Sequence, residues 1–230
     1  MKKVMVACCG LLLVAGSAFA ALSKDEVKRL ADAASIITEL RDAPDKGIPE
    51  ELWSKAECVV VIPSMKKAAF VVGGEYGSGV MSCKTNAWSA PVFMQLAKGS
   101  WGLQIGAEST DLVLLVMNRR GVEKLLSDKV SLGADASVAA GPVGRHGSAA
   151  TDAQLKAEML AYSRSQGLFA GIDLSGGVLK PDKEADARAY GENVSARDVV
   201  MGPKHIAAPE QAAAFLSALK RDVRATTGRK

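Results

Sequence analysis

The chain has 230 residues, a formal net charge of +4 at pH 7 and 48% apolar residues. This length suits one domain or two small ones, and so small a net charge gives no electrostatic reason to expect nucleic-acid binding. Beyond the N-terminus, no apolar run approaches the roughly 20 residues of a membrane-spanning helix, since "LVLLVM" (112–117) has only the length of a strand.

The first 20 residues have the pattern of a secretory signal peptide. Lys2 and Lys3 precede an apolar run over 4–15, and residues 18–20, "AFA", supply the small residues that a signal peptidase recognises. We expect cleavage after residue 20, which removes both lysines and lowers the formal charge from +4 to +2. The sequence therefore predicts an exported protein, periplasmic or secreted, that is soluble or peripheral on a membrane.

The cysteines leave two questions open. Cys8 or Cys9 could be a lipoprotein acceptor, although only four or five apolar residues would then precede it. Cys58 and Cys83 are the two cysteines of the mature chain. They could pair, which in the chain-entropy model would stabilise the fold by about 3.5 kcal/mol. They could equally be two buried thiols in apolar strands.

An amphipathic helix is predicted over 22–44. Ser23 with Glu26 forms a capping box, Leu22 with Val27 a hydrophobic staple, and Pro44 marks the end. Its apolar face is expected to contain Val27, Leu30, Ala34, Ile37 and Leu40. A short second helix is expected over 49–56, with its proline in the first turn.

From residue 57 the pattern changes to short apolar runs separated by Gly, Ser and Asn, which is typical of strands. The expected strands are 58–63, 68–84, 90–97, 100–109, 110–118, 158–165 and 167–179. A brief helix is expected over 120–128 and a C-terminal helix over 209–225. One face of the C-terminal helix is expected to contain Ala212, Phe215, Leu216, Leu219 and Val223. Residues 145–158 are interpreted as a polar linker, and 181–208 give no clear pattern.

Because strands and helices do not alternate, we predict a single α+β domain with an antiparallel-rich curved sheet flanked by N- and C-terminal helices.

The stretch "GADASVAAGPVGR" (133–145) contains almost no large side chain. As a strand, it would place small residues on both faces and let other backbone approach closely on each side. The stretch "GLFAGIDLSGG" (167–177) has a similar composition and is expected to lie close by. We interpret the small residues as a feature of the architecture.

Motifs for catalysis are weak. The stretch "GGEYGSGVMSCKT" (73–85) resembles a phosphate loop, but Cys83 precedes the lysine where a Walker loop needs glycine, and Ser82 replaces the last glycine of a dinucleotide fingerprint. There is no G-x-S-x-G elbow, and the only histidines are His146 and His205. The sequence therefore predicts no catalytic site, no cofactor and no enzyme.

The acidic residues also predict neither a catalytic site nor a metal site. The histidine and cysteine spacings match no metal site, and the aspartates at 135 and 173 are more typical of turns, so no metal is expected. Asp182, Glu184 and Asp186 are interpreted as the solvated face of a charged linker.

Clusters of basic residues are the remaining signal. Lys66 and Lys67 are expected in a turn between two strands, where both would face water, and the two terminal helices carry further cations. These residues are the candidates for contact with anionic lipid, and they comprise Lys66, Lys67, Arg145, Lys24, Lys28, Arg29, Lys220, Arg221 and Arg224. The alternative for the C-terminal cluster is a solvated tail that complements the helix dipole. The alternative for the N-terminal helix is packing on its own domain.

Five stretches occur in the order typical of the SYLF domain family, which the chain therefore resembles. They are "IPSMKKAAFVVGGEYGSGV", "WSAPVFMQL", "GLQIGAESTDLVLLVMN", "GADASVAAGPVGR" and "YSRSQGLFAGIDLSGG". The resemblance implies a lipid-binding domain over 21–230 without enzymatic activity, with phosphoinositide affinity in eukaryotic members. It also implies that the lipid contact lies in the N-terminal amphipathic segment, here 22–41. Some eukaryotic members join the domain to a Src-homology-3 domain and bind and bundle actin.

The first functional hypothesis is an exported, non-catalytic module that binds phospholipid or phosphoinositide head groups at the cell envelope. Its expected partner is an anionic membrane surface; the protein partner is left undefined, and actin is not expected for an exported protein. The alternative is a structural or protein-interaction role in the envelope, with lipid affinity only incidental.

Overall fold

The computed structural model describes residues 21–42, 47–69, 72–101, 108–144, 156–165 and 168–220. The proposed signal peptide and three of the basic candidates, Arg145, Arg221 and Arg224, lie outside these residues. Within them, nine strands form one curved sheet in the order β5-β9-β3-β2-β1-β4-β7-β6, with β8 paired to β7. All pairings are antiparallel except that of β6 with β7. The predicted α+β class with an antiparallel-rich curved sheet is confirmed.

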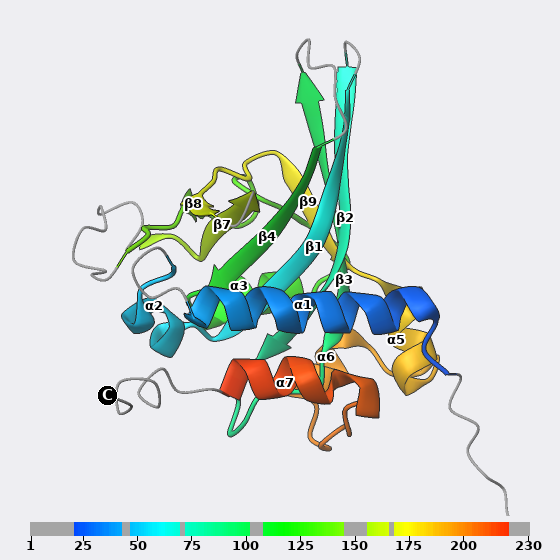
Figure 1. Ribbon diagram of the computed structural model, residues 1–230. Helices are drawn as coiled ribbons and strands as arrows, with labels where there is room; N and C mark the ends of the chain where they lie inside the picture. The colour runs from blue at the N-terminus through cyan, green and yellow to red at the C-terminus, as the bar shows by residue number, and fades with distance from the viewer. Residues whose placement is uncertain are drawn as a thin grey trace, which may run out of the picture.

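Four long strands form the centre of the sheet. They are β1 (Cys58–Ala69), β2 (Val72–Cys83), β3 (Val92–Trp101) and β4 (Glu108–Val116). Their far ends project beyond the helices as a ribbon (Figure 1). Shorter strands extend the sheet on both sides: β5 (Val130–Ser131), β6 (Val138–Ala140), β7 (Met159–Ser165), β8 (Leu168–Gly171) and β9 (Gly177–Pro181).

The helices cover both faces of the lower part of the sheet. On one face lie α1 (Lys24–Asp42), α2 (Glu50–Lys55), the 3₁₀ turn η2 (Glu210–Ala212) and α7 (Ala213–Lys220), as Figure 1 shows. The opposite face packs against α3 (Arg119–Leu125) and α6 (Ala196–Met201), and α5 (Lys183–Tyr190) lies at the end of α1. Alternate residues of β1 therefore enter two different cores: Val59 and Val61 face α1, whereas Val60 and Ile62 face the other layer. None of the helices in the described ranges is long and apolar enough to span a membrane.

The N-terminal helix begins as its sequence predicts. The Ser23 amide donates to Glu26 Oε2 at 2.6 Å and the Glu26 amide donates to Ser23 Oγ at 3.3 Å, which completes the capping box. Leu30, Ala34, Ile37 and Leu40 are buried as expected. Val27 is exposed instead, because Glu26 takes the buried position of the first turn and pairs with Arg188 of α5.

Several boundaries of strands and helices differ from the prediction. Lys66 and Lys67 lie within β1, not in a turn between strands, because a bulge between Ile62 and Met65 lets the strand continue. At the bulge, Ser64 adopts a left-handed φ of 50°, and its amide donates to Asp111 Oδ1 at 2.8 Å. Residues 100 and 101 continue β3 and do not start a new strand. Pro49 precedes α2 as its N-cap.

The small-residue stretch forms less strand than predicted, because residues 133–135 turn and only Val138–Ala140 is a strand. Its architectural role is nevertheless supported at Gly141. A Cβ at this glycine would lie 2.0 Å from Cζ of buried Tyr162. A Cβ at Gly171 of β8 would lie 2.3 Å from the Gly141 carbonyl oxygen. The second small-residue stretch is thus the expected close neighbour.

Residues 181–208, which gave no clear pattern, contain α5 and α6. The interpretation of Asp182 and Asp186 as a solvated face is wrong, because both side chains are buried. Asp182 caps α5 and accepts a hydrogen bond at 2.9 Å from Arg29 of α1. Asp186 accepts one at 2.8 Å from the Phe93 amide of β3. These partners come from elements far away in the sequence.

Candidate functional site

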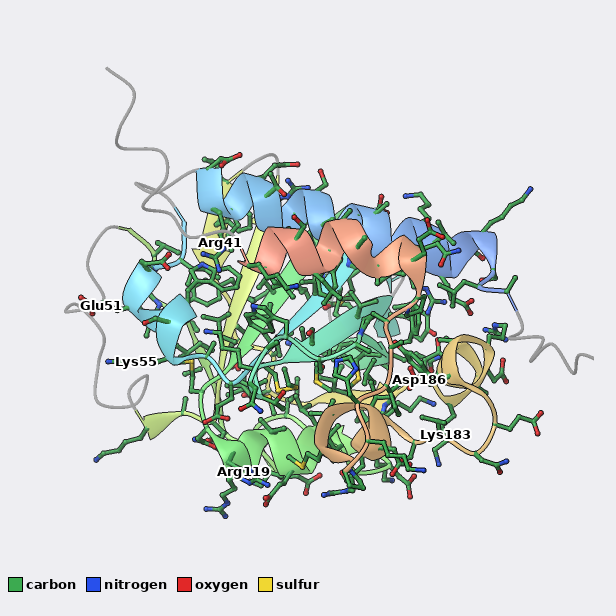
Figure 2. The ribbon with its side chains drawn as sticks, turned by 90° about the horizontal axis from the view of Figure 1, so that it is seen from below. Arg41, Glu51, Lys55, Arg119, Lys183 and Asp186 are labelled. Atoms are coloured by element: carbon green, nitrogen blue, oxygen red, sulfur yellow. A yellow bond between two sulfur atoms is a disulfide. The ribbon has the colours of Figure 1, made fainter. Side chains whose placement is uncertain are left out.

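A cationic cleft lies where the C-terminal ends of α1 and α7 meet α2 and the turn that follows β2. Its volume is about 420 Å³. Within the part of the chain that the structure describes, three cationic side chains and one carboxylate, that of Glu50, line it, and two tryptophans add aromatic surface. The cations are Arg41, Lys84 and Lys220, and the tryptophans are Trp53 and Trp88. Figure 2 labels Arg41 beside α2 and the end of α7.

Arg41 is held by contacts from two other elements, α2 and α7. Its guanidinium lies 4.6 Å from the centre of the Trp53 ring, donates from Nη2 to the Leu219 carbonyl at 3.3 Å, and lies 3.7 Å from a Glu50 carboxylate oxygen. Its side chain is only 8% exposed. A buried guanidinium stacked on an aromatic ring is oriented by several weak contacts. Its position is therefore set before any ligand arrives.

Lys84 is the second fixed cation. Its Nζ donates to the backbone carbonyls of Trp53 and Ser54 at 2.9 and 3.2 Å, and it lies 5.1 Å from the centre of the Trp88 ring. Burial lowers the pKa of Lys84, and the positive charge of Arg41 acts in the same direction. An anion placed between these cations would relieve their repulsion.

A disulfide holds the strands that carry this site. Cys58, at the start of β1, is bonded to Cys83, at the end of β2, so the structure pairs the two cysteines that follow the proposed signal peptide. Lys84 follows directly, and its amide donates to the Glu57 carbonyl at 2.6 Å. The turn then closes with an isolated bridge between Lys84 and Trp88. The cross-link therefore fixes the base of the cleft.

The cleft is suited to binding an anion. The hydroxyl of Ser54 donates to the Glu51 carbonyl at 2.8 Å and that of Thr85 to the Ala87 carbonyl at 3.2 Å, so both hydroxyls in the lining already have a backbone partner. Arginine and lysine side chains bind carboxylate or phosphate groups. Within the described residues, no group of three His, Cys, Asp or Glu side chains could hold a metal ion.

Among the described residues, one of the basic residues expected to contact lipid lines this cleft. Lys220, at the end of α7, is exposed and forms part of its rim. Lys24 and Lys28 are exposed on α1, and Lys28 pairs with Asp32. Arg29 forms a salt bridge with buried Asp182, so its guanidinium has a structural role in the fold.

The two lysines of the ribbon lie elsewhere. Lys66 is exposed, whereas Lys67 is half-buried and lies 3.6 Å from Glu75 of β2. Lys66 is eight residues along β1 from Cys58, which corresponds to roughly 25 Å of strand. The structure thus does not bring these lysines together with Lys220, and their contact with lipid stays a prediction.

The residues predicted from the sequence did not include Arg41, Lys84 or the two tryptophans of the cleft. A local signal existed, because the segments "ELWSK" and "CKTNAWS" each place a tryptophan within four residues of a lysine. Only the fold shows that these segments face each other, since Lys84 and Trp53 are 31 residues apart.

Comparison with known proteins finds one matching family over residues 97–222, described as Ysc84, "Las17-binding protein actin regulator". The SH3 domain-containing YSC84-like protein 1 of Rattus norvegicus is 35% identical over 184 residues, which are 78% of this chain and 54% of that protein. The Homo sapiens protein of the same name is 34% identical over the same shares. LAS seventeen-binding protein 3 of Saccharomyces cerevisiae is 35% identical over 164 residues, 69% of this chain and 35% of that protein. The chain therefore spans about half the length of its mammalian relatives and a third of the yeast one.

These names correct one expectation. We expected an undefined protein partner and no link to actin, yet one relative is named for binding LAS seventeen and the matching family is described as an actin regulator. The comparisons thus point toward protein partners.

Proposed function

Because the chain belongs to the Ysc84 family, whose domain is also called SYLF, we propose that it is a non-catalytic binding domain whose cleft takes the head groups of anionic phospholipids. The observation that carries this proposal is the convergence of Arg41, Lys84 and Lys220 beside two tryptophans. Trp53 is buried, but Trp88 is partly exposed, and tryptophan prefers the level of the head groups in a bilayer. Each basic residue near an anionic surface contributes about 1 kcal/mol of attraction.

Vesicle flotation tests this proposal. The full chain should float with vesicles containing phosphatidylglycerol and not with neutral phosphatidylcholine vesicles, and the binding should weaken as salt rises. Lys220→Glu should lower the partition coefficient on the order of tenfold, because it reverses one charge at the cleft.

The matched control is Lys66→Glu, which makes the same charge change on the ribbon. If the ribbon lysine matters as much as the cleft lysine, the assignment to the cleft is wrong. Equal recovery with neutral and anionic vesicles would remove the electrostatic mechanism altogether.

We also propose that the protein acts after export, at the cell envelope, once residues 1–20 have been removed. The disulfide between Cys58 and Cys83 supports an oxidising compartment. Mass spectrometry of the protein from an envelope fraction should find Ala21 as the first residue. An intact N-terminus, or recovery in the cytoplasm, would contradict this part.

A protein-binding role is the second candidate, and the names of the relatives favour it. Co-sedimentation with actin filaments, run beside the vesicle assay, separates the two roles. Sedimentation with filaments, unaffected by Lys220→Glu, would place protein binding on another surface. Loss of both activities in this variant would mean that lipid and protein compete for one cleft.

A further inference from the structure

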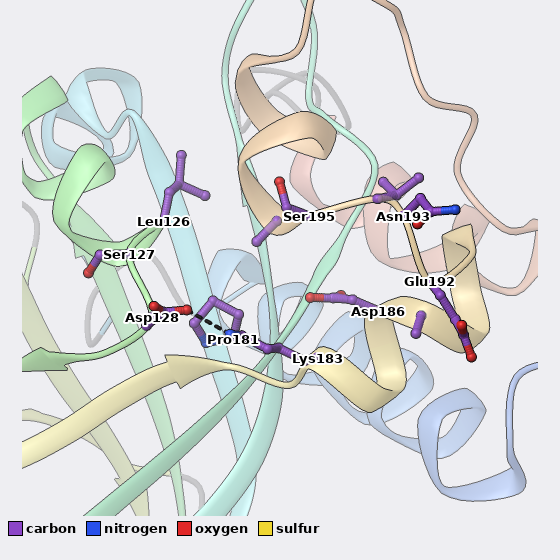
Figure 3. A pocket seen from close by; sticks show the side chains of 12 residues that line it. Leu126, Ser127, Asp128, Pro181, Lys183, Asp186, Glu192, Asn193 and Ser195 are labelled. Carbon is purple, nitrogen blue, oxygen red and sulfur yellow. Dashed lines mark hydrogen bonds and ion pairs between the residues drawn. The ribbon is translucent and has the colours of Figure 1, made fainter.

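A second pocket lies at the opposite end of α1 from the cationic cleft, between α5, the start of α6 and the loop after α3 (Figures 2 and 3). Its volume is about 320 Å³, at the small end of the range for small-molecule sites. Leu126, Pro181 and Val194 give it apolar walls, and Asp186 enters it from α5.

The Asp186 carboxyl group has one oxygen without a partner. Oδ1 accepts the hydrogen bond from the Phe93 amide at 2.8 Å, whereas Oδ2 is buried and has no partner among the described residues. The side chain as a whole is only 3% exposed. A buried carboxyl oxygen without a hydrogen-bond donor destabilises the folded protein. Because this oxygen is directed at a cavity, a ligand that donates a hydrogen bond to it would remove that destabilisation. Figure 3 shows the carboxyl group directed into the space between Pro181 and Ser195.

The charges around Asp186 make a cationic donor the best match. The other two buried carboxylates of this region have partners, because Asp182 is bound by Arg29 and Glu26 by Arg188. Lys183 cannot supply the missing donor where it stands, because its ammonium group pairs with Asp128 at 2.7 Å on the far side of the pocket. Asp186 is thus the carboxyl group of this cluster for which the structure shows no cation.

We propose that this pocket binds a small primary amine, with its ammonium group on Asp186 Oδ2 and its alkyl part against Leu126, Pro181 and Val194. An ammonium N–H supplies both the positive charge and the hydrogen bond that the ionised carboxylate accepts. The volume limits the ligand to a short chain. The site is separate from the cationic cleft and would take a ligand of opposite charge.

Protonation of Asp186 should compete with the amine. Burial raises the pKa of Asp186 to about 7; the Phe93 amide opposes this shift, while the negative charges of Asp182 and Glu26 add to it. The other charged or titratable groups that line the pocket, pair with these carboxylates or lie on α5 and α6 are Arg29, Arg188, Tyr190, Lys183, Asp128, Glu192, Glu184, Arg197 and Asp198. Because only the ionised carboxylate accepts an ammonium group, affinity should rise roughly tenfold from pH 6 to pH 8.

Titration of the isotope-labelled full chain with three probes, followed by NMR, tests this proposal. Butylammonium has charge and N–H donors, butyltrimethylammonium has charge alone, and butanol has neither the charge nor an ammonium donor. We expect butylammonium to bind about tenfold more tightly than the other two at pH 8, with shifts at the amides of residues 186 and 192–196. Equal affinity for all three probes, or shifts elsewhere, would overturn the proposal.

Asp186→Asn should abolish the preference for butylammonium, because the amide oxygen can still accept from Phe93 while its NH₂ group replaces the acceptor in the pocket. Glu184→Gln is the matched control: it removes one negative charge from an exposed position of the same helix and should keep the preference. A loss of equal size in both variants would mean general electrostatics and would reject the site. Should Asp186→Asn fail to fold, the pH dependence of the wild-type protein decides, and an affinity that does not change between pH 6 and pH 8 rejects the proposal.

Discussion

Gly141 is required by a neighbour that is far away in the sequence. It follows β6, and the ring of Tyr162 on β7 occupies the space where a side chain would begin. Gly171 of β8, the register partner of Tyr162, also lies against the Gly141 backbone, so a side chain at either glycine would clash. The lack of side chains in this stretch is thus explained by close packing.

Gly141→Ala should therefore destabilise the protein by about 3 kcal/mol, the upper end of the usual cost of overpacking. Gly99→Ala is the control, because a Cβ there would meet nothing within 4 Å, and it should change stability by less than about 0.5 kcal/mol. Chemical denaturation measures both. Similar losses in the two variants would show that the contact with Tyr162 is not the cause.

Asp186 should make stability depend on pH. Its pKa is about 7 in the folded protein and near its ordinary value when unfolded, so the folded state binds the proton more tightly. Its contribution is fully present below pH 4 and is lost as the pH rises through 7, a change of about 4 kcal/mol. Asp186→Asn should lack this component. Unfolding at pH 5 and pH 8 tests this, and an equal pH response in the variant and the wild type would contradict it.

At the scale of elements, the disulfide links the start of β1 to the end of β2 at the base of the cationic cleft. The double variant Cys58→Ser/Cys83→Ser should lose about 3.5 kcal/mol of stability, as expected for a loop of 25 residues. It should also bind anionic vesicles less well, because Lys84 follows the cross-link directly. Denaturation with and without a reductant measures the first effect: the reductant should weaken the wild type and leave the variant unchanged. A wild type insensitive to reduction would contradict this role.

Local sequence was sufficient where the determinants are local. The capping box of Ser23 and Glu26 marks the start of α1, and the apolar run 112–116 forms the buried strand β4 as expected. Prediction failed at Lys66 and Lys67, whose strand continues only because the bulge at Ser64 is held by Asp111 of β4.

Prediction of the sites was limited for the same reason. Buried Asp182 is bound by Arg29, which is 153 residues away, and buried Asp186 by the Phe93 amide, which is 93 residues away. The cationic cleft joins α1, α2, the turn after β2 and α7, so that composition alone indicates basic residues but not which of them meet. Of the basic residues expected to contact lipid, only Lys220 lies there among the described residues.

At the scale of the whole molecule, the two pockets lie at opposite ends of α1 and have opposite charge. The cleft near Arg41 has an excess of cations, whereas the pocket near Asp186 has a carboxyl oxygen without a partner. The helical layer would thus separate the proposed anion site from the proposed amine site. A ligand at one end need not interfere with a ligand at the other.

The three tryptophans allow the central claim to be tested in one measurement, because two line the cationic cleft and the third, Trp101, ends β3 on the projecting ribbon. The full chain would be titrated with short-chain phosphatidylglycerol while the indole N–H resonances are followed by NMR. Binding in the cleft predicts that the signals of Trp53 and Trp88 shift together and saturate while that of Trp101 stays in place. A shift of Trp101 alone, or no saturable shift of the other two, would contradict head-group binding at this cleft.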